Sequence, residues 1–141
     1  MGCDIHLHAE IKVCGVWHHY SKPQITRHYI LFERMAGVRG DVENAIAAPR
    51  GVPDDATFTT RYDFDHYGSD AHSASWLGAE EISMLVKYAE EMKKILVRDW
   101  YSPELEEFGF LFGNGLEHVK RYPDSYPKGL EDFRWVFWFD N

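Results

Sequence analysis

The chain has 141 residues, 45% of them hydrophobic and 16% aromatic, which suits one domain with a single core. Its net charge of −8, from 23 acidic and 15 basic residues, disfavours duplex DNA, whereas a metal ion or a few arginines can still attract a small anion. No apolar stretch reaches membrane-spanning length, the first residues lack the basic and apolar regions typical of a signal peptide, and two cysteines are too few for a disulfide scaffold. We therefore expect a single domain over residues 1–141 in the cytosol, away from membranes.

The first predicted element is a strand from Cys3 to Val13, because apolar and polar residues alternate there without a break. Such a strand is half-buried, with one face toward the core and the other toward polar surroundings. The apolar face carries Cys3, Ile5, Leu7, Ala9, Ile11 and Val13, and the polar face carries Asp4, His6, His8, Glu10 and Lys12.

A hairpin is expected directly after this strand. Cys14-Gly15 can turn the chain into a second strand from Val16 to Tyr20. A two-residue loop sets the register of that hairpin, with the pairs Glu10 to His19 and Lys12 to Trp17.

The middle of the chain predicts a short helix and then a long loop. Apolar residues at near-helical spacing between Tyr29 and Val38, followed by Gly40, favour a helix that packs on the apolar face of the hairpin. From Arg39 to Ser75 the periodicity disappears, while aromatic residues remain frequent. We therefore expect this segment, and Asp63 to Ser75 above all, to be an ordered loop that forms part of a site.

The last third predicts further helices and a closing strand. Ala79 to Val97 has the apolar stripe of a long helix, Ser102 to about Phe112 opens like a short one, and a turn of helix is possible around Leu116 to Lys120. Phe133 to Asp140 alternates aromatic and other residues and is apolar enough for a central strand. The predicted fold class is α+β: a small, mainly antiparallel sheet including the N-terminal hairpin and the C-terminal strand, packed with one long and two or three short helices.

His6 and His8 are the strongest candidates for chemistry. On one strand face their Cα atoms lie about 6.6 Å apart, so two imidazoles can converge on one metal ion. Asp4 and Glu10 flank the pair but are roughly 20 Å apart, so all four residues cannot bind one ion. Either the site holds two ions, or one of the carboxylates orients a histidine or acts as general base. The alternative is an ordinary solvent-facing strand.

A second Asp-x-His pattern, Asp70-Ala71-His72, completes a possible metal site. If its segment folds over the first strand, His6, His8, Asp70 and His72 make four ligands suited to Zn²⁺, Mn²⁺ or Fe²⁺, and Zn²⁺ or Mn²⁺ is the expected cofactor. The alternative is that Asp70 and the serines after it only begin the next helix.

Two further residues are candidates at this stage. Arg50, inside the rigid Pro49 to Pro53 turn, could bind a phosphate, or it could be a surface arginine paired with Asp54 or Asp55. Asp140 could place a carboxylate beside the polar face of the first strand if the two terminal strands are neighbours.

Five sequence blocks resemble a family of small proteins of tailed bacteriophages and some bacteria. The likeness extends over nearly the whole chain and implies an accessory protein of a phage or mobile element, without implying a reaction. Separately, Asp4 to His8 resembles the first metal-binding strand of the polymerase-and-histidinol-phosphatase and amidohydrolase families, which supports a metal site and not their barrel fold. The five blocks are Met1 to His6, Tyr29 to Phe32, Pro49 to Pro53, Ser69 to Ser73 and Val136 to Asn141.

Two functions remain open. The first is a metal-dependent hydrolase of a phosphoester or nucleotide, with the ion on the four ligands above, Asp4 or Glu10 as general base and Arg50 on the developing charge. The second is a non-catalytic binding protein that sequesters a signalling nucleotide or inhibits a host defence protein. Its binding surface would use the aromatic residues Trp17, Tyr62, Tyr67 and Trp76.

Overall fold

The computed structural model describes residues 2–95 and 115–141. Within these ranges the chain forms one four-stranded antiparallel sheet with strand order β2-β1-β4-β3 and four α-helices. The elements in chain order are β1 (Asp4–Val13), β2 (Val16–Ser21), α1 (Tyr29–Ala36), α2 (Phe58–Tyr67), β3 (His72–Gly78), α3 (Ala79–Ile95), α5 (Gly115–Arg121) and β4 (Leu130–Asp140).

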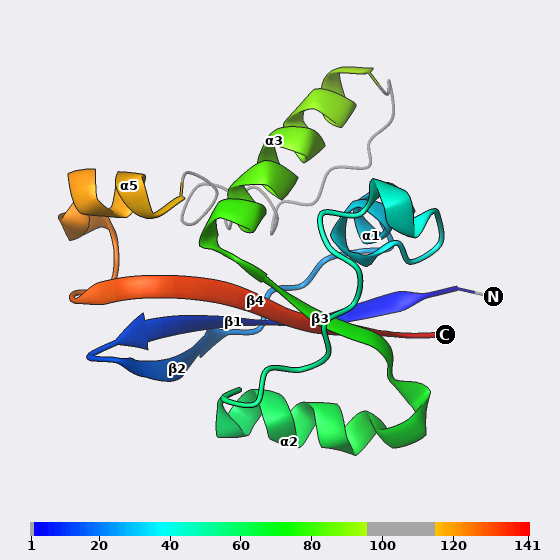
Figure 1. Cartoon of the computed structure of the whole chain (residues 1–141), viewed down its shortest axis with the longest axis horizontal. Helices are drawn as coiled ribbons and strands as arrows, with labels where there is room; N and C mark the ends of the chain where they lie inside the picture. Colours follow the sequence, from blue (N-terminus) through cyan, green and yellow to red (C-terminus); the bar gives the residue numbers. More distant parts are fainter. Residues whose placement is uncertain (1, 96–114) are drawn as a thin grey trace.

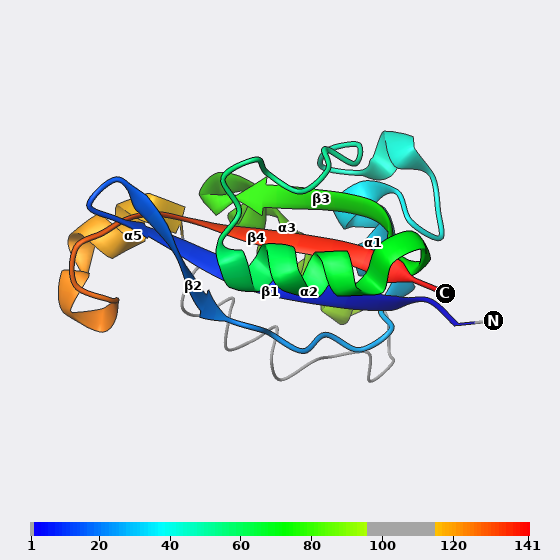
Figure 2. The ribbon, with the colours of Figure 1, turned by 90° about the horizontal axis from the view of Figure 1, so that it is seen from below.

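The helices cover both faces of the sheet (Figure 1). Helices α1, α3 and α5 lie on one side, and α2 lies alone on the other, across β1 and β4 (Figure 2). The predicted α+β class, with one long and two or three short helices, is therefore confirmed by the described residues, which have one long and three short helices. The central position of the C-terminal strand is also confirmed, because β4 lies between β1 and β3.

The apolar face of β1 builds the core, as its alternation predicts. Directly opposed residues of an antiparallel pair share a face, and β1 places Ile5 opposite Phe139 and Leu7 opposite Phe137. Helix α1 adds Phe32, whose ring centroid lies 5.0 Å from that of Phe139. Burying each such large side chain stabilises the fold by about 1.5–3 kcal/mol. The core of the described residues thus joins the two terminal strands to α1 and α3.

Gly37 ends α1 for a steric reason. Its φ of +77° is left-handed, and its N–H donates to the carbonyl of Glu33 at 2.8 Å. A Cβ atom at this position would lie 2.6 Å from Cα of Val42. The helix predicted for residues 29–38 is therefore confirmed but stops two residues earlier, at Ala36.

The predicted loop from Asp63 to Ser75 is wrong as secondary structure, because it contains the end of α2 and the start of β3. Helix α2 lacks an apolar stripe because its inward side chains are polar and contact the sheet, as described below. Strand β3 is irregular because a shift in its register between His72 and Ser75 contains Ser73, which has a φ of +54°. Both features hide the usual periodicities.

The remaining helices agree with their predictions where the structure describes them. The long helix begins at Ala79 and is described up to Ile95, and the turn predicted around Leu116 to Lys120 is α5. The short element predicted from Ser102 to Phe112 lies outside the described residues.

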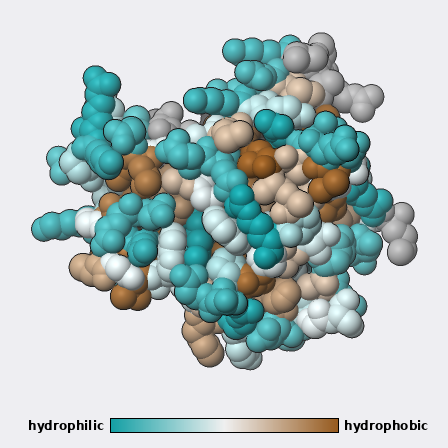
Figure 3. All heavy atoms as spheres, viewed as in Figure 1, coloured by the Kyte–Doolittle hydropathy of each residue, from teal (hydrophilic) through white to brown (hydrophobic). Residues whose placement is uncertain are grey.

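The side of the molecule drawn in Figure 3 is mostly hydrophilic, with apolar residues in small separate groups. None of the helices in the described ranges is long and apolar enough to cross a membrane.

Candidate functional site

We call the outward residues of β1 and the residues directly opposite them on β4 the polar face of the sheet. The register places Asp4 opposite Asp140, His6 opposite Trp138, His8 opposite Val136 and Glu10 opposite Arg134. The terminal strands are therefore neighbours, and a carboxylate from the end of β4 does lie beside the first strand. Helix α2 covers this face, so the segment after Arg39 supplies the side chains that meet it (Figure 2).

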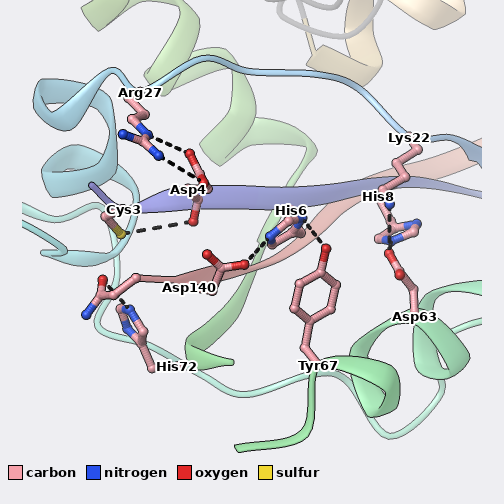
Figure 4. Close-up of polar contacts among 11 residues, drawn as sticks. Cys3, Asp4, His6, His8, Lys22, Arg27, Asp63, Tyr67, His72 and Asp140 are labelled. Carbon is pink, nitrogen blue, oxygen red and sulfur yellow. Dashed lines mark hydrogen bonds and ion pairs between the residues drawn. The ribbon is translucent and has the colours of Figure 1, made fainter. Parts of the chain in front are cut away.

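His6 lies in a chain of hydrogen bonds with Asp140 and Tyr67 (Figure 4). Its Nε2 is 2.7 Å from Oδ2 of Asp140, and its Nδ1 is 3.0 Å from the hydroxyl of Tyr67. Because a carboxylate only accepts, Nε2 of a neutral His6 carries the hydrogen and Nδ1 accepts from Tyr67. The order Asp140, His6, Tyr67 is a carboxylate-imidazole-hydroxyl relay, which can move a proton to or from the hydroxyl.

His8 forms a second chain two residues along the strand. Its Nε2 is 2.7 Å from Oδ2 of Asp63 on α2, and its Nδ1 is 2.8 Å from Nε2 of His19 on β2. The ammonium of Lys22 lies 3.0 Å from the same oxygen of Asp63. His8 is 1% exposed, so a ligand would reach it only through these neighbours.

The pKa values of the residues hydrogen-bonded around His8 show which protonation form each group adopts. Burial lowers the pKa of His8 even though Asp63 raises it, and burial also lowers the pKa of His19. Burial would raise the pKa of Asp63, but hydrogen bonds from His8 and Lys22 outweigh it and lower that pKa. At neutral pH this hydrogen-bond chain therefore consists of the Asp63 carboxylate and the neutral imidazoles of His8 and His19.

Tyr67 remains a phenol at neutral pH. Burial, and then the negative charge of Asp63, raise the pKa of its hydroxyl above the ordinary value of 10.0. A hydroxyl in that state donates to Nδ1 of His6 and gives up its proton only when it receives another.

Trp138 forms the floor between the two histidine chains. Its side chain is fully buried, and its ring stacks on those of His6 and His8 at interplanar angles of 28° and 21°, with centroids 6.0 and 5.4 Å away. Phe64 and Tyr67 of α2 meet it edge-on, at 5.2 and 5.8 Å. Trp138 therefore fixes the positions of both imidazoles. Its indole N–H has no hydrogen-bond partner within the described part of the chain.

Glu10, predicted as a general base, lies in a buried ionic network with Arg134. Its Oε1 accepts from the Arg134 guanidinium at 2.8–2.9 Å, and its Oε2 accepts from the N–H and hydroxyl of Thr57 and the hydroxyl of Thr60 at 2.6–2.9 Å. Burial alone would raise its pKa, but these hydrogen bonds lower it. The Glu10 carboxylate is 0% exposed and anchors the first turn of α2. A catalytic role for Glu10 stays a prediction.

Asp4 and Arg50, the other two predicted catalytic residues, lie in ion pairs outside the histidine chains. Figure 4 shows the Asp4 carboxylate turned toward Arg27, which binds both of its oxygens at 2.7 and 3.2 Å. Arg50 binds both oxygens of Glu81 at 2.6 and 2.7 Å and covers the ring of Trp76 at 4.3 Å. The expected surface pairing of Arg50 was therefore wrong about the partner, since it is neither Asp54 nor Asp55.

The four predicted metal ligands do not converge. His72 is opposite Phe139 in the register, and its ring stacks on that of Phe139 at 6.1 Å, on the face opposite to His6. The irregular start of β3 explains this placement, because one residue more or less on a strand exchanges the two faces. Asp70 is exposed in a 3₁₀ turn before β3, and no hydrogen bond or ion pair joins it to His6 or His8 in the described ranges. Their metal-binding role stays a prediction.

Among the described residues, no group of three or more His, Cys, Asp or Glu side chains could hold one metal ion. The residues that do meet His6 and His8 are Tyr67, Asp63, His19 and Lys22, and none of them was among the predicted ligands. The hairpin register, which pairs His19 with Glu10 and is confirmed, already placed His19 on the polar face. For Asp63 and Tyr67 the sequence indicated only that their segment forms part of a site, and it gave neither residue a contact with His6 or His8.

Comparison with protein-family models, with curated proteins and with solved structures finds no match to this chain. The resemblance to small phage and bacterial proteins stays an expectation. The candidate function therefore depends on the geometry of the polar face.

Proposed function

We propose that this chain is a hydrolase of a phosphoester or nucleotide and that the polar face under α2 is its active site. The observation that carries the proposal is the relay of Asp140, His6 and Tyr67, joined by contacts of 2.7 and 3.0 Å. Carboxylate-oriented imidazoles that act on a hydroxyl are the usual means of moving protons in hydrolysis.

In this proposal the relay serves as a general base. A water molecule bonded to Tyr67 gives its proton to the phenol oxygen while Tyr67 gives its own to Nδ1 of His6. Asp140 stabilises the resulting imidazolium, and the hydroxide attacks phosphorus. As the bond from phosphorus to the leaving oxygen breaks, His6 returns its proton through Tyr67 to that oxygen, so the group leaves as an alcohol. Asp140 and His6 have side chains 23% and 18% exposed, so the site is open to small molecules.

Metal dependence, expected from the sequence, remains part of the proposal. A Zn²⁺ or Mn²⁺ ion would polarise the phosphoryl oxygen. It would also reduce the electrostatic repulsion between the carboxylates of Asp63 and Asp140 and an anionic substrate. Lys22, whose side chain is 42% exposed, supplies a further positive charge beside Asp63.

The test is a hydrolysis assay on a panel of phosphomonoesters, phosphodiesters and nucleotides, with and without chelator. We expect Tyr67→Phe and Asp140→Asn to lower kcat/KM by about 10²- to 10⁴-fold, the usual contribution of a positioned acid or base. Tyr122→Phe, an exposed tyrosine beyond α5, is the matched control and should behave as wild type. Absence of turnover on every ester, or a Tyr67→Phe variant as active as wild type, would contradict the proposal.

A second candidate function is a nucleotide-sequestering protein, and one observation favours it. Helix α2 directs Phe58 and Tyr62, which are 81% and 67% exposed, away from the sheet, with ring centroids 5.8 Å apart. Of the aromatic residues expected to form a binding surface, Trp17 and Trp76 instead lie under Arg134 and Arg50, and Tyr67 belongs to the relay. An exposed aromatic pair can stack on a base.

Equilibrium dialysis with a nucleotide panel tests this alternative. A sequestering protein retains an unchanged nucleotide in the presence of chelator, and Phe58→Ala with Tyr62→Ala weakens binding by about 1–3 kcal/mol for each stacked base. Retention that is equal in the double variant and wild type would show that the aromatic pair has no such role.

A further inference from the structure

The contact between His8 and His19 brings two imidazole nitrogens close to the spacing of two ligands of one metal ion. The two nitrogens that face each other, Nδ1 of His8 and Nε2 of His19, are 2.8 Å apart, and the ring planes meet at 63°. Two nitrogen ligands of a tetrahedral Zn²⁺ ion lie about 3.3 Å apart, since each is about 2.0–2.1 Å from the metal. To admit an ion, this nitrogen-to-nitrogen distance has to lengthen by roughly half an ångström, and each ring, with centroids now 5.1 Å apart, has to turn so that its lone pair points at the ion.

The environment of His8 fixes the nitrogen that a metal would use. Asp63 accepts a hydrogen bond from Nε2 at 2.7 Å, so Nε2 holds the hydrogen and Nδ1 directs its lone pair at His19. A carboxylate that binds the far nitrogen of an imidazole is the usual support of a metal-ligating histidine. His6 differs, because a tyrosine hydroxyl and not a second imidazole faces its Nδ1.

His19 can supply the second ligand without a change of fold. It is partly exposed on β2, and its Nε2 can release its hydrogen when the imidazole changes tautomer, so that Nδ1 carries the hydrogen instead. Burial lowers the pKa of both imidazoles, so no charged histidine has to lose a proton to the solvent at neutral pH.

We propose that His8 and His19 bind one transition-metal ion through Nδ1 and Nε2, with Asp63 orienting His8 and with water or a substrate oxygen in the remaining positions. Two ligands from the chain leave the ion open, as in catalytic sites, with one protein ligand fewer than usual. Lys22, 3.0 Å from Asp63, adds a positive charge that acts on both imidazoles and favours an anionic oxygen as a further ligand. The use of this ion in catalysis rests on the proposed hydrolase, but its binding does not.

Metal binding can be measured without any substrate. The full chain, stripped of metal, is titrated with Co²⁺ and then Zn²⁺ while visible absorption, which reports histidine ligation of Co²⁺, and calorimetry are followed. We expect one equivalent to bind to wild type and binding to be lost in His19→Ala. Asp63→Asn should weaken binding by about 10- to 100-fold, as is typical for a group that supports a metal ligand.

His18→Ala is the matched control, because His18 is the exposed neighbour of His19 on the same strand. It should bind as wild type does. His8→Ala should also lose the ion, and circular dichroism checks that this buried substitution keeps the fold. Wild type that binds no ion, or His19→Ala that binds as wild type, overturns the inference. The hydrolysis assay tests the proposed function separately. Turnover in protein that binds no ion would support the hydrolase and contradict the metal site, and a bound ion without turnover would do the reverse.

Discussion

Arg134→Met is expected to lower the free energy of unfolding by about 3–5 kcal/mol, the usual cost of removing one partner of a buried ion pair. Glu10 is fully buried, and its carboxylate depends on the guanidinium at 2.8–2.9 Å. The same guanidinium binds Asp55 at 2.8 Å and lies over the ring of Trp17 at 3.9 Å. Methionine keeps the volume but leaves a charged, desolvated Glu10. Urea unfolding followed by circular dichroism measures the change.

Arg27→Met is the matched control for that substitution. Arg27 also binds a carboxylate through two nitrogens, but it and Asp4 are about half exposed, so solvent screens the pair. We expect little change in stability. Equal losses of stability in the two variants would show that burial does not make the Glu10–Arg134 ion pair more important for stability than the exposed Asp4–Arg27 pair.

Trp138→Ala is the second substitution expected to have a large effect, lowering the free energy of unfolding by about 3–5 kcal/mol. The ring is fully buried between β4 and α2, and both histidines and two aromatic rings of α2 contact it. Its loss leaves a cavity beneath the polar face. Thermal unfolding of the variant, with wild type in the same buffer, measures the effect.

Trp138→Phe should cost much less than Trp138→Ala. Phenylalanine keeps most of the apolar contact and removes an indole N–H that is buried without a partner in the described residues, a group whose burial is itself unfavourable by about 1–3 kcal/mol. A phenylalanine variant as unstable as the alanine variant would mean that the indole ring, and not its apolar area, holds α2 in place.

Strands β1 and β4 were predictable because their alternation is continuous and their apolar faces are buried, whereas the irregular β3 was not. The β1 pattern fixed which residues face the core, and the two-residue turn at Cys14-Gly15 gave the pairs Glu10 to His19 and Lys12 to Trp17, which are confirmed. The aromatic alternation from Phe133 to Asp140 likewise predicted a central strand, which β4 is.

Helix α2 could not be predicted from periodicity because its inward side chains are polar. Thr60, Asp63 and Tyr67 bind Glu10, His8 and His6, while Phe58 and Tyr62 are exposed. The pattern of this helix is thus the reverse of the one that marks an ordinary amphipathic helix. In the structure Thr57 caps its first turn, with the side-chain hydroxyl accepting from the N–H of Thr60.

The candidate site was predictable for the residues of β1 and β4 and not for those that α2 brings to them. His6 and His8 followed from the alternation, and the place of Asp140 followed from the pairing of the terminal strands. The position of His72 depended on the irregular register at Ser73, which no local signal indicates.

The pairing of β1 with β4 joins residue 4 to residue 140, so it also governs how the chain folds during synthesis. The first strand leaves the ribosome long before its central partner exists, and until then it has only β2 beside it. Its other edge then exposes unpaired backbone groups next to an apolar face, which is a template for aggregation. Pairing across so long a separation is also slow. Nascent chains stalled before β4 should therefore depend on chaperones far more than the released protein does.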